Sequence, residues 1–378
     1  RLKIDGVLFG AVLVLTVLGL VFVYSASAFV AVERYRQASH YFFVRQLIYA
    51  ATGLGLLVLF SLVDYRWFRS PQAVFLGLGS VLGTVTLAAV LGSRGRFLEA
   101  FGAQVQPSEF AKPATAIYLA WLAVEARERI QDVRWLVPRL LPVGLLCAVI
   151  GYRDLGNAAM VAVITAVVLF LAGLRWKHLM IMGALAAVAA CLGIVSEPYR
   201  LKRVVDHLDP QHRLARAIGQ EEWLRQYLAR SPIQGDTGYQ AHQAELAIGA
   251  GGLAGRGIMQ GTQKLLFLPE AHTDCIYAIV GEELGLLGTL GVLAGFGVIF
   301  WRGSLWALRA PDRFGTYLSA ALTVGIVVQA LLNMTVVLNL GPTKGIPMPL
   351  LSYGGSCMWS TMVSLGMIMS VGARSESA

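Results

Sequence analysis

A short stretch of the sequence, residues 106–112, places a carboxylate and a cation at the edge of an apolar segment. Glu109 and Lys112 are three residues apart, and Pro107 precedes them. Because residues i and i+3 share a helix face and proline suits a first turn, we expect a helix opening here with an ion pair between these side chains. A cation in a cavity open to lipid suits the binding of phosphates on a membrane-borne substrate. The alternative is an interfacial ion pair whose lysine extends towards water.

A second stretch, residues 268–274, ends in a carboxylate directly before a long apolar segment. A carboxylate at the membrane edge, partly removed from water, has the raised basicity that a general base needs. Asp274 is therefore the candidate catalytic residue, and His272 beside it is a candidate substrate contact. The structural alternative is that Asp274 caps the helix that follows, since an aspartate at an N-cap accepts unpaired backbone N–H groups. The two roles are compatible.

Three further polar side chains stand beside apolar segments, namely Arg153, Lys344 and Ser352. An ionisable side chain inside a bilayer costs about 2.5–3.5 kcal/mol, so such residues usually face a cavity and have a function. We therefore count all three as candidate substrate contacts. For Ser352, which precedes two glycines, close helix packing through small residues is the alternative.

These side chains need a scaffold of membrane-spanning helices, and the composition supplies one. Of the 378 residues, 56% are apolar and 14% are charged, whereas about 25% are charged in ordinary soluble domains. The mean hydropathy is +0.64. These values exclude a soluble enzyme, a disordered chain and a disulfide scaffold. About 20 apolar residues cross a bilayer, so we expect an all-α polytopic membrane protein with ten spans, at 8–30, 43–63, 73–92, 108–124, 137–152, 155–173, 178–195, 275–301, 316–338 and 350–372.

The distribution of basic residues predicts how the chain is oriented in the membrane. The connections on one side, such as 64–70, 127–139 and 302–313, hold more arginine and lysine than those on the other. The richer side is expected to be cytoplasmic, which places both termini inside. The net charge of +9 is explained in this way rather than by nucleic-acid binding.

The chain is expected to form a single domain over 1–378, with one large extracytoplasmic loop at 196–274, between spans seven and eight. A long loop without a span is uncommon unless it carries function. Within it, Leu214, Ile218, Leu224 and Leu228 line one face of a predicted helix over 211–230. This helix is expected either to lie in the lipid interface or to pack on the outer surface of the protein.

Other features predict no chemistry. The glycine-rich stretch 249–257 follows no strand and precedes no Gly-Lys-Ser/Thr, so it is interpreted as a turn between short helices rather than a phosphate-binding loop. The four cysteines show no paired spacing and are interpreted as small buried hydrophobic residues. The six histidines form no cluster in the sequence, so no metal site built by the protein is expected.

Five segments together resemble the SEDS family of bacterial cell-wall proteins, whose members are FtsW, RodA and SpoVE. The segments are 24–28, 106–112, 268–285, 342–345 and 349–356, and they occur in family order over nearly the whole chain. The stretches 269–274, 342–345 and 199–210 look more like the FtsW subgroup than RodA. Arg153 and Gln104 depart from the family pattern, which has Pro at the first position and often Ser or a basic residue at the second, and the segment around 211–237 is long.

The resemblance implies a peptidoglycan glycosyltransferase that polymerises lipid II at the outer face of the bacterial cytoplasmic membrane, in cell division or elongation. The essential aspartate of the family maps onto Asp274 and its Glu-Lys pair onto Glu109 and Lys112. Asp274 would take the proton of the acceptor hydroxyl, while Lys112, helped by Arg153, would hold the pyrophosphate. A divalent cation, Mg²⁺ or Mn²⁺, is compatible with that pyrophosphate. The implied partners are lipid II, a class B penicillin-binding protein and other membrane proteins of the divisome or elongasome.

Two rival functions stay open at this point. A transporter that flips lipid II across the membrane would also have ten spans with buried charges, and a non-catalytic scaffold would recruit a transpeptidase. A flippase needs a polar path through the bilayer, whereas Lys112, Arg153, Asp274 and the other polar residues fall near the outer ends of the predicted spans. This asymmetry favours an enzyme.

Overall fold

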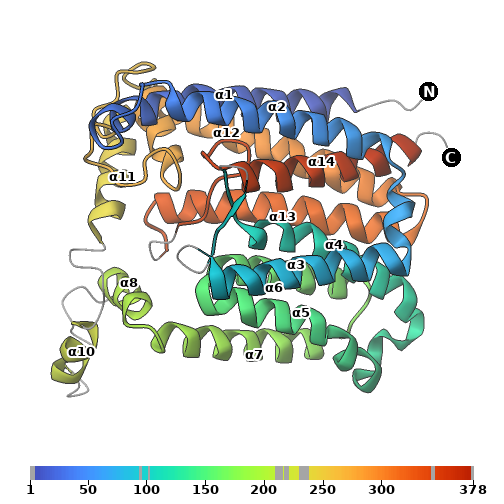
Figure 1. The fold of residues 1–378 in the computed structure, drawn as a ribbon. Coiled ribbons are helices and arrows are strands. Elements are labelled where there is room, and N and C mark those ends of the chain that lie inside the picture. Colours follow the sequence, from blue (N-terminus) through green and yellow to red (C-terminus); the bar gives the residue numbers. More distant parts are fainter. Residues whose placement is uncertain are drawn as a thin grey trace.

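The computed structural model describes residues 5–92, 96–100, 103–208, 216, 221–229, 238–341 and 345–375, and it is a bundle of long helices that run roughly parallel to one axis (Figure 1). The helices are α1 Gly6–Glu33, α2 Tyr41–Leu62, α3 Pro71–Leu91, α4 Pro107–Ala126, α5 Val133–Arg153, α6 Leu155–Leu171, α7 Trp176–Val195, α8 Pro198–Leu208, α10 Glu221–Leu228, α11 Gly238–Gly251, α12 Ile276–Arg309, α13 Arg313–Val337 and α14 Gly355–Ser375. Short 3₁₀ helices, η1 Tyr65–Arg69 and η2 Arg127–Gln131, and a small antiparallel hairpin, β1 Leu98–Ala100 and β2 Ala103–Val105, complete the described elements.

Each of the ten predicted spans coincides with one of these helices. Eight of the described helices are long and apolar enough to cross a membrane, and α6 is a shorter apolar helix. The tenth, α4, carries Glu109, Lys112 and Pro113 near its start. The prediction of an all-α polytopic membrane protein is therefore confirmed.

The bundle has two distinct ends. One, which we call the loop end, is formed by the described residues among 34–40, 92–106 and 196–275, and its helices α8, α10 and α11 lie at the left of Figure 1. The first turn of α1 and the last turn of α14 both lie at the opposite end. Both described ends of the chain are thus on the same side of the bundle.

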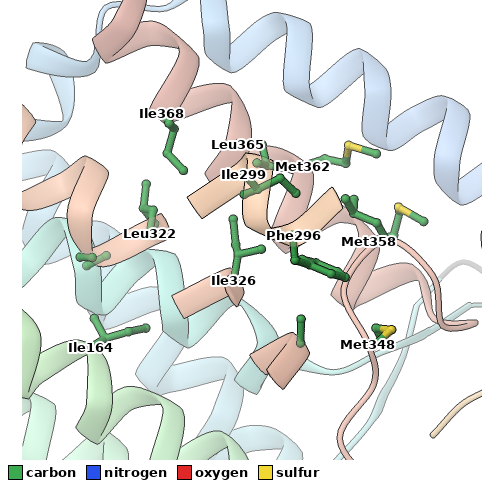
Figure 2. Close-up of a cluster of buried hydrophobic side chains, with 14 of the residues drawn as sticks. Ile164, Phe296, Ile299, Leu322, Ile326, Met348, Met358, Met362, Leu365 and Ile368 are labelled. Carbon is green, nitrogen blue, oxygen red and sulfur yellow. The ribbon is translucent and has the colours of Figure 1, made fainter. Parts of the chain in front are cut away.

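The core lies where α14 packs against α2, α4, α12 and α13. Figure 2 shows the apolar side chains that meet there, including Phe296, Ile326 and Met362. Of the most apolar window of α14, 89% is buried inside the protein, whereas the corresponding share for α7 is 0%. Helix α14 is therefore the centre of the bundle, and α7 is a peripheral helix that contacts α6 and α8.

Helix α12 is not the uninterrupted span predicted over 275–301. It breaks at Gly285, whose φ of 66° and ψ of −158° are outside the helical region. Side chains at Gly251 or Gly255 would collide with the backbone carbonyls of Gly281 and Glu283. The glycine-rich stretch thus allows the end of α11 and the following turn to pack directly on the backbone of α12, and the predicted turn is a close-packed one.

The large loop contains more helix than the sequence predicted. Helices α8 and α11 were not expected, and of the predicted helix 211–230 only residues 216 and 221–229 are among those described. Within α10, Leu224 is buried and Tyr227 Oη donates a hydrogen bond to the carbonyl of Val195, 2.6 Å away. This described part packs on the protein, as the second of the two alternatives expects.

Candidate functional site

The candidate catalytic carboxylate lies at the loop end, in the turn that leads into α12. Glu270, with a positive φ of 52°, begins this turn, and its carbonyl accepts the N–H groups of Thr273, Asp274 and Cys275. The N-cap of α12 is Cys275, without a side-chain cap. The structural alternative, that Asp274 caps this helix, is therefore wrong, and its carboxylate is not used by the helix end.

The backbone of Gly345 lies directly against the Asp274 side chain. A Cβ at residue 345 would collide with Oδ2 of Asp274, so no other residue fits there without moving the carboxylate. Gly345 ends the predicted motif 342–345. Lys344, predicted as a substrate contact in the same motif, lies outside the described residues.

The surroundings of Asp274 raise the pKa of its carboxyl group above the ordinary value. The pKa of Asp274 is raised to about 7, chiefly by burial and then by the carboxylates of Glu270 and Asp154, while the Arg203 and Arg96 guanidiniums oppose the rise. Burial also lowers the pKa of Arg203, which lies on α8. A carboxyl group that titrates near neutral pH is suited to act as a general base.

Two amides on one face of α13 connect Asp274 with the predicted Glu109–Lys112 pair. Asn333 Nδ2 donates to the carbonyls of Asp274, at 2.8 Å, and Ile346, at 2.7 Å. One turn earlier, Gln329 Oε1 accepts a hydrogen bond from Lys112 Nζ, and its Nε2 donates to the carbonyl of Pro347 at 2.9 Å. Residues four apart on a helix are neighbours. The two amides therefore connect the turn with Asp274, the segment 346–347 and Lys112 on α4.

The predicted ion pair on α4 is present and buried. Lys112 Nζ lies 2.7 Å from Glu109 Oε2, and the exposed fractions of the side chains are 8% and 1%. Glu109 Oε1 accepts a hydrogen bond from Asn157 Nδ2 at 3.1 Å, and Asp154, at the start of α6, caps that helix. The pair is thus not the exposed interfacial pair that formed the alternative. A small cavity of about 20 Å³, room for about one water, borders Lys112 and Gln329.

The other predicted contacts surround the turn that carries Asp274. His272 packs against the rings of Phe42 and Tyr353, with centroid distances of 4.8 and 5.8 Å. Burial lowers the pKa of His272, and its Nδ1 has no hydrogen-bond partner in the described part of the chain. His272, two residues before Asp274, is thus a buried imidazole with one ring nitrogen unpaired within the described residues, and its contact with substrate stays a prediction.

Ser352 holds this turn in place. Its hydroxyl donates to the carbonyl of Thr273 at 2.5 Å and accepts the N–H of Met348. Helix α14 begins at Gly355, later than the predicted start of the last span at residue 350, so Ser352 lies in the turn before it. The structure thus shows a positioning contact for Ser352, and its contact with substrate stays a prediction.

Arg153 is the last residue of α5. Its guanidinium is 4.9 Å from the ring of Tyr152, and its backbone carbonyl accepts a hydrogen bond from Arg96. The sequence did not single out Arg96, Arg203, Gln329 or Asn333 as site residues. Gln329 and Asn333 carried a signal, because they are polar residues four apart inside an apolar span.

Comparisons with known proteins match nearly the whole chain. A family model described as "Cell cycle protein", covering FtsW, RodA and SpoVE, matches residues 6–377. A probable peptidoglycan glycosyltransferase FtsW from Geobacter sp. (strain M18) is 33% identical over 371 residues, which are 97% of this chain and 95% of that protein. Stage V sporulation protein E of Bacillus subtilis (strain 168) is 34% identical over 96% of this chain and 95% of its own length.

Solved structures show the same fold. A chain of a peptidoglycan synthase complex, described as coordinating polymerization and crosslinking, has a TM-score of 0.74 at 24% identity and covers 100% of both chains. Rod shape determining protein RodA of Thermus thermophilus has a TM-score of 0.66 at 22% identity, covering 99% of this chain and 97% of that one.

Proposed function

The chain belongs to the FtsW/RodA/SpoVE family of cell cycle proteins, and from this premise we propose that Asp274 is the general base of a lipid II polymerase. The chain is a peptidoglycan glycosyltransferase, as its relatives are named. The observation that carries the proposed role is a half-buried carboxylate with a pKa of about 7, which is not used as a helix cap and is electrostatically coupled to two arginines.

The reaction joins an acceptor sugar to the anomeric carbon of a donor. The acceptor 4-hydroxyl forms a C–O bond with that carbon and gives its proton to the Asp274 carboxylate. The bond between that carbon and the pyrophosphate oxygen of the donor breaks, and its electron pair stays on the oxygen. The leaving group is undecaprenyl pyrophosphate. A pKa near 7 makes Asp274 largely ionised just above neutral pH while leaving it basic enough to accept the proton.

Proton transfer to Asp274 accounts for part of the rate enhancement, and cations that stabilise the leaving group contribute a further part. Positioned general-base catalysis contributes about 10²–10⁴-fold, and the rest must come from orientation and from stabilising the leaving charge. Arg96 and Arg203 act on the Asp274 carboxylate, so they are the cations that the structure adds to the predicted Arg153. We assign these arginines to the negative charge that develops on the pyrophosphate.

Lys112 and Glu109 are buried, so in this conformation they act on the substrate without touching it. A direct contact between Lys112 and a phosphate requires the ammonium to exchange its bond to Glu109 or Gln329, because it is buried between them. We assign to the pair the fixing of α4 against α6 and α13, and a share of the positive potential. We assign Glu270, which is exposed, to contact with the acceptor sugar, and His272 stays a candidate contact.

A divalent cation fits this site only together with the substrate. Among the described residues, no group of three or more His, Cys, Asp and Glu side chains is arranged to hold a metal ion. Glu270 would supply a protein oxygen to Mg²⁺ or Mn²⁺, and pyrophosphate oxygens would supply the remainder. Such an ion would add positive charge beside the leaving group.

The proposal also specifies the orientation of the chain in the membrane and its partner protein. The loop end faces outward and both termini face the cytoplasm, in agreement with the basic connections at the opposite end. The similar chain that belongs to a synthase complex supports a class B penicillin-binding protein as the partner that crosslinks the strands, within the divisome or elongasome.

The test is a glycan-polymerisation assay with the purified full chain and lipid II, with and without a class B penicillin-binding protein and divalent cations. Asp274→Asn should lose about 10²–10⁴-fold in rate. Because burial opposes ionisation of Asp274, the neutral amide should be no less stable than the wild type at pH 8. Glu245→Gln on α11, which is exposed, is the control and should retain the rate. Full polymerisation by a folded Asp274→Asn variant would contradict the assignment.

A further inference from the structure

A buried amide besides Gln329 and Asn333 lies inside an apolar span, in the second turn of α2. It belongs to Gln46, whose side chain is fully buried. Its Nε2 donates a hydrogen bond to the carbonyl of Ser352 at 3.0 Å, and its Oε1 accepts the N–H of Gly354 at 3.2 Å. Both ends of the Gln46 amide are therefore used on one short segment, residues 352–354, directly before α14.

Residues 352–354 in turn bind the backbone that leads to Asp274. The hydroxyl of Ser352 donates to the carbonyl of Thr273 at 2.5 Å, and the N–H of Tyr353 donates to the carbonyl of His272 at 3.0 Å. The next carbonyl, that of Asp274 itself, accepts a hydrogen bond from α13. Three consecutive carbonyls are thus bound from other segments, two of them by the segment that α2 holds.

A second side chain of α2 contacts the same region. Phe42, four residues before Gln46 and buried, lies with its ring centroid 4.8 Å from that of His272 and 5.1 Å from that of Tyr353. Because residues four apart share a helix face, one face of α2 contacts both the segment 352–354 and the residue two positions before Asp274.

Helix α2 is itself fixed against the most buried helix of the bundle. It packs along α14, and a Cβ at Gly366 of α14 would lie 2.6 Å from the carbonyl oxygen of Leu57 on α2. The two backbones therefore approach more closely than a larger residue would allow. A side chain on a helix packed in this way is held more precisely than one on a loop, so Gln46 connects the residues before Asp274 to a rigid part of the molecule.

We propose that Gln46 is a positioning residue for Asp274, which acts through residues 352–354 and fixes the carboxylate relative to α2 and α14. The assignment rests on the proposed function, in which Asp274 takes the proton of the acceptor. Gln46 and Asn333 then restrain residues 272–274 from two different helices. A base must stay close to its productive position, since a displacement of about 1 Å can cost about a hundredfold in rate.

The experiment compares Gln46→Met with the wild-type full chain, both purified in detergent. Methionine is unbranched and fills irregular spaces in a core, but it makes neither hydrogen bond. In the lipid II polymerisation assay kcat should fall about 10–100-fold and KM should change by less than about twofold, because the base moves while the substrate contacts remain. Hydrogen exchange of the backbone amides of residues 272–275 should become faster, because one of the two restraints on these residues is lost.

Ser61→Ala is the matched control on the same helix. Ser61 is buried, and its hydroxyl donates to the carbonyl of Val58 within α2. This variant also loses one buried polar group of α2, but Ser61 lies 15 residues beyond Gln46 in the sequence. It should keep the wild-type kcat and the wild-type exchange at residues 272–275. Thermal unfolding of both variants shows how much of each is folded at the assay temperature.

A double variant tests whether Gln46 acts through Ser352. The loss of kcat in Gln46→Met/Ser352→Ala should be smaller than the product of the two single losses, because both substitutions break the same connection. If Gln46→Met does not fold, Gln46→Asn gives a milder form of the test, since it keeps an amide on a side chain that is one methylene shorter. Losses that multiply independently would contradict the connection.

The outcomes separate this proposal from the proposed function. Unchanged kcat, or unchanged exchange at residues 272–275, in a folded Gln46 variant would overturn the positioning role, and so would a loss of activity that follows the folded fraction alone. If Asp274→Asn polymerised lipid II at the full rate, the proposed function would fail, whereas the exchange measurement would still decide whether Gln46 holds residues 272–275.

Discussion

Two buried carboxylate–lysine pairs of similar geometry occur in different surroundings. Lys264 Nζ lies 2.6 Å from Glu283 Oε1, and Lys112 Nζ lies 2.7 Å from Glu109 Oε2. Both glutamates are at most 1% exposed. The first pair joins the segment before Asp274 to α12, nineteen residues along the chain. The second is local to one turn of α4.

The partners of each pair differ in kind. Glu283 also accepts hydrogen bonds from Ser25 Oγ, at 2.6 Å, and from the N–H of Met259, at 2.9 Å, and Lys264 also donates to Ser25. This pair therefore ties three chain segments together. Lys112 instead borders a cavity and reaches, through Gln329, the segment next to Asp274. Two equally buried pairs thus have different roles. The Lys264–Glu283 pair stabilises the fold, and the Lys112–Glu109 pair positions the candidate site.

The largest effect is expected at the pair that holds the fold. Lys264→Met should lower the free energy of unfolding by about 3–5 kcal/mol, because it leaves Glu283 charged and buried without its cation. The measurement is thermal unfolding of the purified protein in detergent. Glu283→Gln should cost a similar amount, and the double variant less than the sum. Additive losses would show that the two side chains do not act as a pair.

The same substitution at the other lysine sharpens the comparison. Lys112→Met should cost less stability than Lys264→Met, because Asn157 still donates to Glu109 and the adjoining cavity can admit a water. The polymerisation rate should nevertheless fall about 10–100-fold, since the link to Gln329 and its positive charge are lost. Both are measured on one preparation by unfolding and by the lipid II assay. Equal destabilisation by the two variants, with activity following folding alone, would remove the distinction.

Asn333 offers a test of positioning without a change of charge. Asn333→Ala removes the hydrogen bonds to the carbonyls of Asp274 and Ile346, a cost of about 1–3 kcal/mol for each buried group left unsatisfied. If the amide positions Asp274, kcat should fall by about tenfold with a smaller change in KM. Thr335→Ala is the control, because the Thr335 hydroxyl bonds only within its own helix. An unchanged kcat in a folded Asn333→Ala variant would exclude the positioning role.

The parts of this molecule that could be predicted from the sequence are those set by local patterns. Ten apolar segments predicted ten helices, and the spacing of Glu109 and Lys112 predicted their pairing, because both depend on residues within one helix. The Lys264–Glu283 pair, the approach of Arg203 to Asp274 and the role of Ser352 depend on contacts between segments far apart in the chain. The break at Gly285 was also missed, because an apolar run does not reveal a glycine with positive φ.

The smallest predicted effect concerns the carboxylate beside Asp274. Glu270 is exposed, and its charge raises the pKa of Asp274 after the larger contribution of burial. Asp274 must be ionised to accept a proton, so the wild-type rate should rise with pH through about 7. Glu270→Gln removes the repulsion, lowers the pKa of Asp274 and moves this rise to lower pH, so the relative rate at pH 6 should increase by less than about tenfold. Glu245→Gln should leave the profile in place. An unchanged profile would mean that Asp274 is tuned by burial and the arginines alone, and a shift of the rise to higher pH would contradict the direction assigned to Glu270.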